Sequence, residues 1–135
     1  MPLLGPSAKF QTKDCTITIT EVRAGCVLVA LEGRDRGELG REPFVELEKR
    51  FAAGRGLELF IDLEDAVGAS LDVSGSWAVW LRANRQSLEH VNMLTGSYFV
   101  ELSAQTVKRF SDLGDKVRLY SDRGAFEAAL QARAD

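Results

Sequence analysis

Cysteine, histidine and proline are scarce in this chain of 135 residues, which contains two cysteines, one histidine and three prolines. Cys15 and Cys26 form no CxxC pair, and a hairpin over residues 15–31 would hold them too far apart for a disulfide. A structural zinc site takes four ligands, mostly cysteine and histidine, which this composition disfavours. We therefore expect two reduced, partly buried cysteines, no metal and no cofactor.

Long apolar runs and concentrated positive charge are also missing. No stretch approaches the ~20 apolar residues that cross a bilayer, and the first ten residues, MPLLGPSAKF, lack the basic and apolar regions of a signal peptide. The net charge is −3, and the basic residues are scattered among acidic ones, which disfavours a nucleic-acid-binding face. We therefore expect a cytoplasmic protein that neither spans a membrane nor binds nucleic acid.

Catalytic motifs are absent as well. The sequence contains no GxGxxG, P-loop or HExxH motif, and no serine or cysteine near His90 suggests a triad. Carboxylates do cluster at Asp62, Glu64 and Asp65, after a predicted strand, where ligands often bind in open α/β sheets. One hypothesis is a metal-dependent enzyme that uses them together with Asp72. The preferred interpretation is a solvated acidic strand end in a protein that is not an enzyme.

What the chain does contain is a regular succession of strand and helix patterns. Its 45% hydrophobic and 27% charged residues are typical of one globular domain. We assign residues 1–10 to a flexible lead-in and residues 11–135 to a single domain. Predicted strands span residues 16–22, 26–31, 57–63, 90–95 and 116–120, and predicted helices span residues 42–53, 74–87, 97–112 and 123–132.

The order of these elements, β-β-α-β-α-β-α-β-α, predicts an α/β fold. The first two strands form an antiparallel hairpin that turns near Ala24, and later strands alternate with helices. Right-handed crossovers then give a mixed, mostly parallel five-stranded sheet with helices packed on it. Residues 97–103 fit a strand or a helix, and we favour a helix capped by Ser97. If strand 16–22 is an unpaired edge, it offers a route to a homodimer.

The most informative segment is Asp72-Val73-Ser74-Gly75, at the predicted start of the second helix. A helix N-terminus offers free N–H groups and a partial positive charge. A phosphate added to a serine there would bring about −1.5 to −2 charges and could switch an interface. The alternative is that Asp72 or Ser74 only caps the helix.

Two tryptophans, Trp77 and Trp80, follow this junction three residues apart, so they share one face of the predicted helix. Such a pair most often packs in the core. A fully exposed tryptophan would mark an interface, because aromatic anchors dominate binding energies. We expect one of the two to be largely buried and the other to lie near the surface.

In the order and spacing of its elements from residue 11 onward, the chain resembles the STAS domain, named for sulphate transporters and anti-sigma-factor antagonists. Three local matches carry the resemblance. The segment Asp72-x-Ser74-Gly75 is similar to the family's D-S-S/T-G junction, and Leu31-Glu32-Gly33 is similar to its L-x-G before the first helix. Residues 107–130, which include the strand KVRLY, resemble its C-terminal third.

The resemblance implies a non-enzymatic switch module of bacterial-type signalling. In the antagonist branch, such a domain binds an anti-sigma factor that is also its kinase. Phosphorylation of the residue after the motif aspartate blocks that binding, and a phosphatase restores it. Val73, which has no hydroxyl, stands at this position here. We therefore predict that either Ser74, ahead of Ser70 and Ser76, has become the phosphoacceptor, or the partner is bound constitutively.

The favoured function is thus docking of a protein partner, an anti-sigma factor or kinase-like regulator, through the loop and start of helix two. A related branch resembles lipid-binding SEC14 domains, which implies the alternative of a small-ligand or lipid carrier. The predicted partner-binding and regulatory surface comprises Gly33, Arg34, Asp35, Asp72, Val73, Ser74, Gly75, Ser76 and Trp77.

Overall fold

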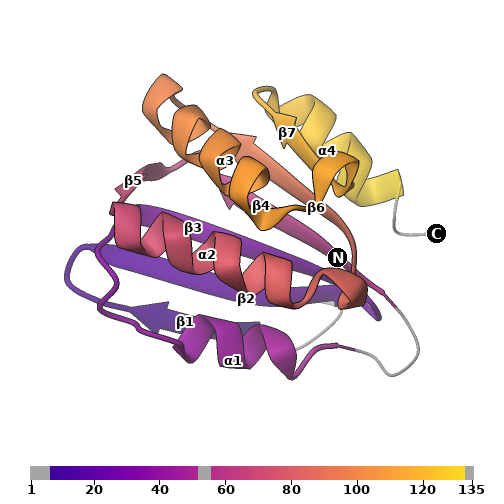
Figure 1. Cartoon of the computed structure of the whole chain (residues 1–135), viewed down its shortest axis with the longest axis horizontal. Helices are drawn as coiled ribbons and strands as arrows, with labels where there is room; N and C mark the ends of the chain where they lie inside the picture. Colours follow the sequence, from indigo (N-terminus) through magenta and orange to yellow (C-terminus); the bar gives the residue numbers. More distant parts are fainter. Residues whose placement is uncertain (1–6, 52–55, 133–135) are drawn as a thin grey trace.

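The computed structural model describes residues 7–51 and 56–132. They build a mixed seven-stranded sheet whose main path runs β1-β2-β3-β4-β6-β7, with β5 paired to the end of β3 (Figure 1). The strands are β1 (Ser7–Gln11), β2 (Cys15–Arg23), β3 (Cys26–Asp35), β4 (Leu57–Leu63), β5 (Ala66–Ala69), β6 (Leu88–Thr95) and β7 (Val117–Tyr120). The helices are α1 (Glu42–Glu48), α2 (Leu71–Ala83), α3 (Tyr98–Ser111) and α4 (Arg123–Ala132), with short 3-10 turns at Arg85–Ser87 and Gly114–Lys116.

The first three strands are antiparallel, as the alternation of threonine and isoleucine in the sequence predicts. Ile17 and Ile19 of β2 are fully buried, and the hairpin to β3 turns at Ala24-Gly25, where Gly25 has a φ of 80°. The prediction that this strand is an unpaired edge is wrong, because β1 pairs along it. Residues 7–10, assigned to the lead-in, thus belong to β1, and residues 1–6 lie outside the described residues.

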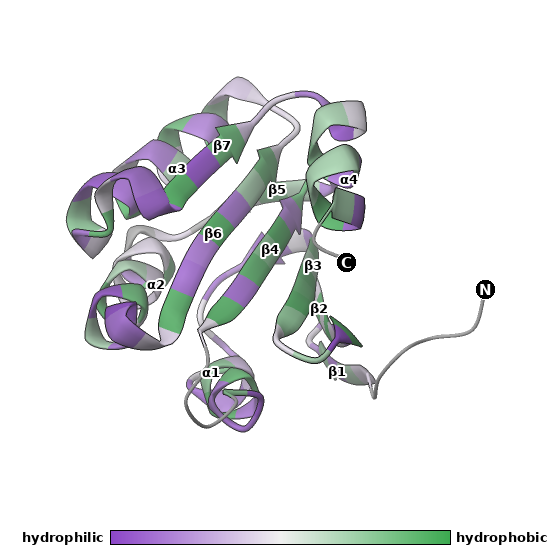
Figure 2. Cartoon of the chain, turned by 90° about the vertical axis from the view of Figure 1, so that its right-hand side faces the viewer, coloured by the Kyte–Doolittle hydropathy of each residue, from purple (hydrophilic) through white to green (hydrophobic). Residues whose placement is uncertain are grey.

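The remaining strand pairings are parallel, and helices cover both faces of the sheet. Figure 2 shows α1, α2 and α3 on one side of the central strands and α4 on the other. Alternate residues of β3 accordingly enter two cores: Val27 faces the cluster under α1–α3, and Cys26 faces the smaller cluster around Phe126 of α4. The mixed sheet with an antiparallel hairpin and four helices is confirmed. The predicted strand count of five is wrong, because β1 and β5 were missed.

The segment before α2 differs most from its prediction as a loop over residues 64–73. Its middle forms β5, and Ser70 then caps α2 by accepting a hydrogen bond from the N–H of Val73 (3.1 Å). The helix therefore begins three residues earlier than predicted, and neither Asp72 nor Ser74 is its cap. Helix α1 is also shorter than predicted, because it ends at Glu48; residues 52–53 lie outside the described residues.

The ambiguous stretch at residues 97–103 is helical, as favoured. Ser97 caps α3 through a hydrogen bond from the N–H of Val100 (3.2 Å), and the helix ends at Asp112, which has a left-handed φ of 62°. Both cysteines are buried, and burial raises the pKa of the Cys15 thiol to about 11. Across residues 7–51 and 56–132, no helix is long and apolar enough to cross a membrane.

Candidate functional site

The pairing of β3 with β5 brings together two predicted site segments that are far apart in the sequence. The last three residues of β3, Gly33–Asp35, pair with residues 66–69 in parallel register. The ladder continues beyond β5, where the N–H of Ser70 donates to the carbonyl of Asp35 (3.1 Å). Because Ser70 caps α2, this bond sets the start of α2 beside the loop that follows β3.

That loop, residues 36–41, is shaped by a buried carboxylate and two glycines. The Asp35 side chain is only 6% exposed, and its Oδ1 accepts a hydrogen bond from the N–H of Gly37 (2.9 Å). Gly37 and Gly40 have φ values of 86° and 60°, which side-chain-bearing residues rarely adopt. Asp35 therefore acts mainly on the backbone of its own loop, which it turns toward α1.

A cleft of about 980 Å³ lies between this loop with α1 on one side and α2 on the other. In Figure 1, α1 and α2 lie one above the other in front of the antiparallel strands. Six of the nine predicted surface residues line the cleft: Asp35, Asp72, Val73, Gly75, Ser76 and Trp77. The other wall was not predicted from the sequence, and it is lined by Arg36, Gly37, Leu39, Gly40, Arg41 and Phe44.

An aromatic cluster joins the two walls of the cleft. Phe44 of α1 stacks on Trp80 (5.4 Å between ring centroids) and meets Trp77 edge-on (4.9 Å). Trp80 also donates from Nε1 to Glu48 (2.8 Å), which pairs with Arg41 at the rim (3.4 Å). Trp80 is 3% exposed and Trp77 is partly exposed, so the prediction of one buried and one surface tryptophan is confirmed.

The cleft combines partly exposed aromatic surface, small exposed residues and charged groups of both signs. The described residues that line it include no histidine and no cysteine. The histidine, His90, lies in β6 outside the cleft lining and contacts Glu58 of β4 (2.5 Å). Within residues 7–51 and 56–132, no cluster of three or more His, Cys, Asp or Glu side chains could hold a metal ion.

Gly33 and Arg34 do not line the cleft, although both belong to the predicted surface. Gly33 has a φ of 87°, and a Cβ added to it would lie 2.1 Å from the carbonyl oxygen of Asp14. Its N–H donates to the carbonyl of Asp65 (3.1 Å), and the N–H of Arg34 donates to Asp14 (2.9 Å). Position 33 therefore requires glycine, because β3 lies here against the backbones of Asp14 and Asp65. The exposed side chain of Arg34 lies outside the cleft.

Ser74 points away from the cleft. Its side chain is 8% exposed and lines a small apolar cavity of about 60 Å³ beneath α2 and α3, together with Ile61 and Val107. A kinase could reach its hydroxyl only if the start of α2 moved off the sheet. Its role as phosphoacceptor stays a prediction, whereas Ser76, on the next turn, is exposed in the cleft.

Replacing Ser74 by aspartate is expected to lower the free energy of unfolding by about 2–3 kcal/mol, because it places a carboxylate in an apolar cavity. The matched change Ser76→Asp should stay within about 0.5 kcal/mol of the parent, since its side chain reaches water. Urea denaturation followed by circular dichroism measures both. Equal stabilities for the two variants would contradict this assignment of buried and exposed serines.

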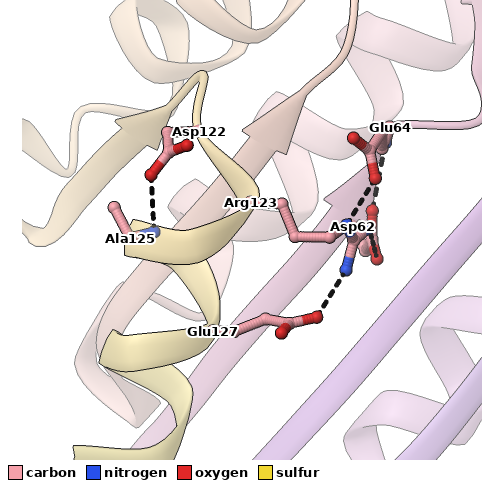
Figure 3. Close-up of polar contacts among 6 residues, drawn as sticks. All are labelled: Asp62, Glu64, Asp122, Arg123, Ala125 and Glu127. Atoms are coloured by element: carbon pink, nitrogen blue, oxygen red, sulfur yellow. Dashed lines mark hydrogen bonds and ion pairs between the residues drawn. The ribbon is translucent and has the colours of Figure 1, made fainter.

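Two carboxylates at the end of β4, Asp62 and Glu64, are paired with an arginine of α4. Figure 3 shows Arg123 reaching toward Asp62, Glu64 and Glu127. Its Nη2 lies 2.6 Å from Asp62 and its Nη1 2.9 Å from Glu127, while its Nε donates to Glu64. Hydrogen bonding, to Asp62 above all, raises the pKa of Arg123. Asp62 and Glu64, two of the three carboxylates predicted to cluster here, thus fasten α4 to the end of β4 through Arg123.

No protein-family model and no curated protein sequence matches the chain. Among solved structures, it is similar to the anti-sigma factor antagonist SpoIIAA in its unphosphorylated form, with a TM-score of 0.60 and 16% identity over 88% of this chain and 97% of that chain. It is also similar to an uncharacterized protein of the DUF3478 family from Shewanella loihica PV-4, with a TM-score of 0.58 and 13% identity over 96% of this chain and 97% of that one. The chain therefore has a SpoIIAA-like fold, as its resemblance to the STAS domain predicts.

Proposed function

We propose that this chain is a cytoplasmic, non-enzymatic interaction module whose protein partner docks in the cleft between the loop at residues 36–41 and α2. The observation that carries the proposal is the convergence of Asp72, Gly75, Ser76 and Trp77 on that one cleft. The fold likeness to an anti-sigma factor antagonist supports a partner of the same class, an anti-sigma factor or kinase-like regulator.

We further propose that binding is constitutive. Val73 has no hydroxyl at the position of the family's phosphoacceptor, and Ser74 is buried. The polar ends of the cleft carry charges of both signs: Asp72 projects from the first turn of α2, and Arg36 and Arg41 project from the facing loop. Opposite charges on the partner would set its orientation, while Trp77 supplies apolar contact area.

Replacing Asp72 by lysine is expected to weaken partner binding at least tenfold, because a charge is reversed at the cleft and an acidic residue is lost from the helix start. The immobilised chain would first capture its partner from the source organism's lysate, and mass spectrometry would identify it. The purified partner would then be titrated by calorimetry. The control is Asp115→Lys, at another exposed aspartate in the first turn of a short helix outside the cleft.

Ser76→Arg, which would place a long basic side chain in the cleft, should also weaken binding. Equal affinities for the parent, Asp72→Lys and Ser76→Arg would remove the cleft from the interaction. A weaker affinity is evidence for docking in the cleft only if all variants keep the parent's circular dichroism spectrum and unfolding midpoint.

A substitution at Gly75 can separate an effect on folding stability from an effect on partner binding, because no contact among the described residues requires glycine there. It lies inside α2, and an added Cβ would meet no atom within 4 Å. Gly75→Ala should therefore raise the free energy of unfolding by about 0.5–1 kcal/mol. If the partner's surface approaches this backbone closely, the same variant should bind several-fold more weakly. A more stable variant with unchanged affinity would exclude Gly75 from the interface.

The carrier hypothesis has less support from the geometry. The apolar cavity beneath α2 and α3 measures about 60 Å³, whereas ligand sites typically run to about 300–1,000 Å³ and are mostly apolar. The cleft has such a volume, about 980 Å³, but charged residues of both signs, among them Asp72 and Arg36, line it. A carrier would need α2 or α3 to move away from the sheet before a ligand could enter.

A further inference from the structure

Helix α3 carries two apolar stripes, of which the fold uses only one. Val100, Ala104 and Val107 are buried against the sheet and α2. On a neighbouring face of the same helix, Phe99 is 77% exposed and Phe110 is 61% exposed. Figure 1 shows α3 at one edge of its layer, with α2 between it and α1. The second stripe is therefore open along the length of the helix.

This second stripe, the α3 outer face, is continuous from one end of the helix to the other. Leu102, 41% exposed, follows Phe99 by one turn. Thr106 comes next, and its hydroxyl donates to the Leu102 carbonyl (3.0 Å), so the polar group is already satisfied within the helix. With the exposed ring of Tyr98, the α3 outer face offers roughly 500 Å² of apolar surface, in the range of the largest patches on monomers.

A polar row beside this stripe indicates what covers it. Glu101, Gln105 and Arg109 follow one another at four-residue spacing, so they form one ridge along the helix. Their order is acidic, amide, basic. A second α3 running antiparallel, related by a two-fold axis, presents the same ridge in reverse. Glu101 then faces the partner's Arg109, the two Gln105 side chains meet at the centre, and Phe99 lies against the partner's Phe110.

We propose that the α3 outer face is a self-association surface, on which a second copy of this chain docks as a symmetric antiparallel helix pair. A parallel pair would set like charges against each other, whereas the antiparallel pair matches opposite charges twice. Two such faces bury roughly 1,000 Å² in total, which is below the standard size of stable interfaces and gives a weak, concentration-dependent dimer. Because this face is separate from the cleft residues, each copy keeps its cleft for a partner.

Sedimentation equilibrium over a wide concentration range tests the proposal. The parent should show a reversible monomer–dimer equilibrium. Glu101→Arg and Arg109→Glu should each raise the dissociation constant about tenfold or more, because each reverses both rim pairs. The double variant Glu101→Arg/Arg109→Glu should return to within a few-fold of the parent. The control variant Asp72→Lys, in the cleft, should dimerise as the parent does even if it loses its protein partner.

A second pair of variants, Phe99→Ser and Phe110→Ser, should also shift the equilibrium to monomer, with unfolding midpoints confirming that they remain folded. A parent that is monomeric at all concentrations would overturn the proposal. So would a dimer that tolerates both phenylalanine changes, or a charge-swapped double variant that stays monomeric. A monomeric parent that cosediments with phosphatidylcholine–phosphatidylglycerol vesicles, and loses them with Phe99→Ser, would assign the face to a lipid surface instead.

Discussion

Replacing Trp80 by alanine is expected to lower the free energy of unfolding by about 3–5 kcal/mol and to abolish docking in the cleft. The indole is buried, stacks on Phe44 and Phe51 of the facing segment, and donates to Glu48. Its removal leaves a large cavity between α1 and α2 and takes away one of the two partners of the Glu48 carboxylate, so that only Arg41 remains. The wall of the cleft thus depends on the same side chain as the core beneath it.

Urea denaturation measures this loss. It should be followed by circular dichroism and not by tryptophan fluorescence, because the variant lacks one of the two tryptophans. The control is Trp80→Phe, which keeps an aromatic ring beside Phe44 but loses the hydrogen bond to Glu48. It should cost about 1–2 kcal/mol and retain most partner binding. If Trp80→Ala unfolds no more readily than Trp80→Phe, the aromatic cluster is not what holds α1 against α2.

Replacing Gly33 by alanine is expected to cost about 3 kcal/mol or more, although only one methyl group is added. Part of the cost is the positive φ, which side-chain-bearing residues adopt at about 1–2 kcal/mol. The rest is steric: the new Cβ would lie 2.1 Å from the Asp14 carbonyl oxygen, so the β2 and β3 backbones must separate there. The hydrogen bond from the Arg34 N–H to that same oxygen would be strained as well.

Gly40→Ala is the matched control, because Gly40 also has a positive φ, of 60°, but an added Cβ would meet nothing within 4 Å. It should cost only about 1 kcal/mol. The difference between the two variants, measured by urea denaturation, isolates the steric clash at Gly33. Equal costs would mean that β3 can shift away from Asp14 freely, and the β3–β5 pairing would then be a poor anchor for the cleft.

The residues of the predicted surface have different roles: some shape the backbone, some face the cleft and one faces the core. Gly33 and Asp35 shape the backbone, Asp72 and Ser76 face the cleft, and Ser74 faces the core. Residue type alone does not distinguish these roles. Asp35 and Asp72 are both acidic residues next to a chain turn, yet the first is buried and bonded to Gly37 while the second is exposed.

Hydrophobic periodicity was enough to locate most of the elements. The strand at residues 57–63 and the helix at residues 123–132 have the predicted bounds, and Ser97 caps the helix that it was expected to cap. The physical reason is that these segments carry their own signal: a continuous apolar run, an amphipathic repeat or a capping serine. The mixed α/β order and the likeness to the STAS domain followed from the same local patterns.

Only the tertiary structure decided β1, β5 and the cleft. The two strands are short and contain few large apolar side chains, so their stability comes from hydrogen bonds to β2 and β3 rather than from a pattern of their own. The pairing of β5 places Ser70 at the start of α2, and this start sets which side of the helix Ser74 and Ser76 occupy. Ser74 and Ser76 are two residues apart and so lie on nearly opposite sides of the helix, and the packing that buries the first exposes the second. The sequence therefore determined which elements form, and the contacts between distant segments determined which side chains of α2 a partner can reach.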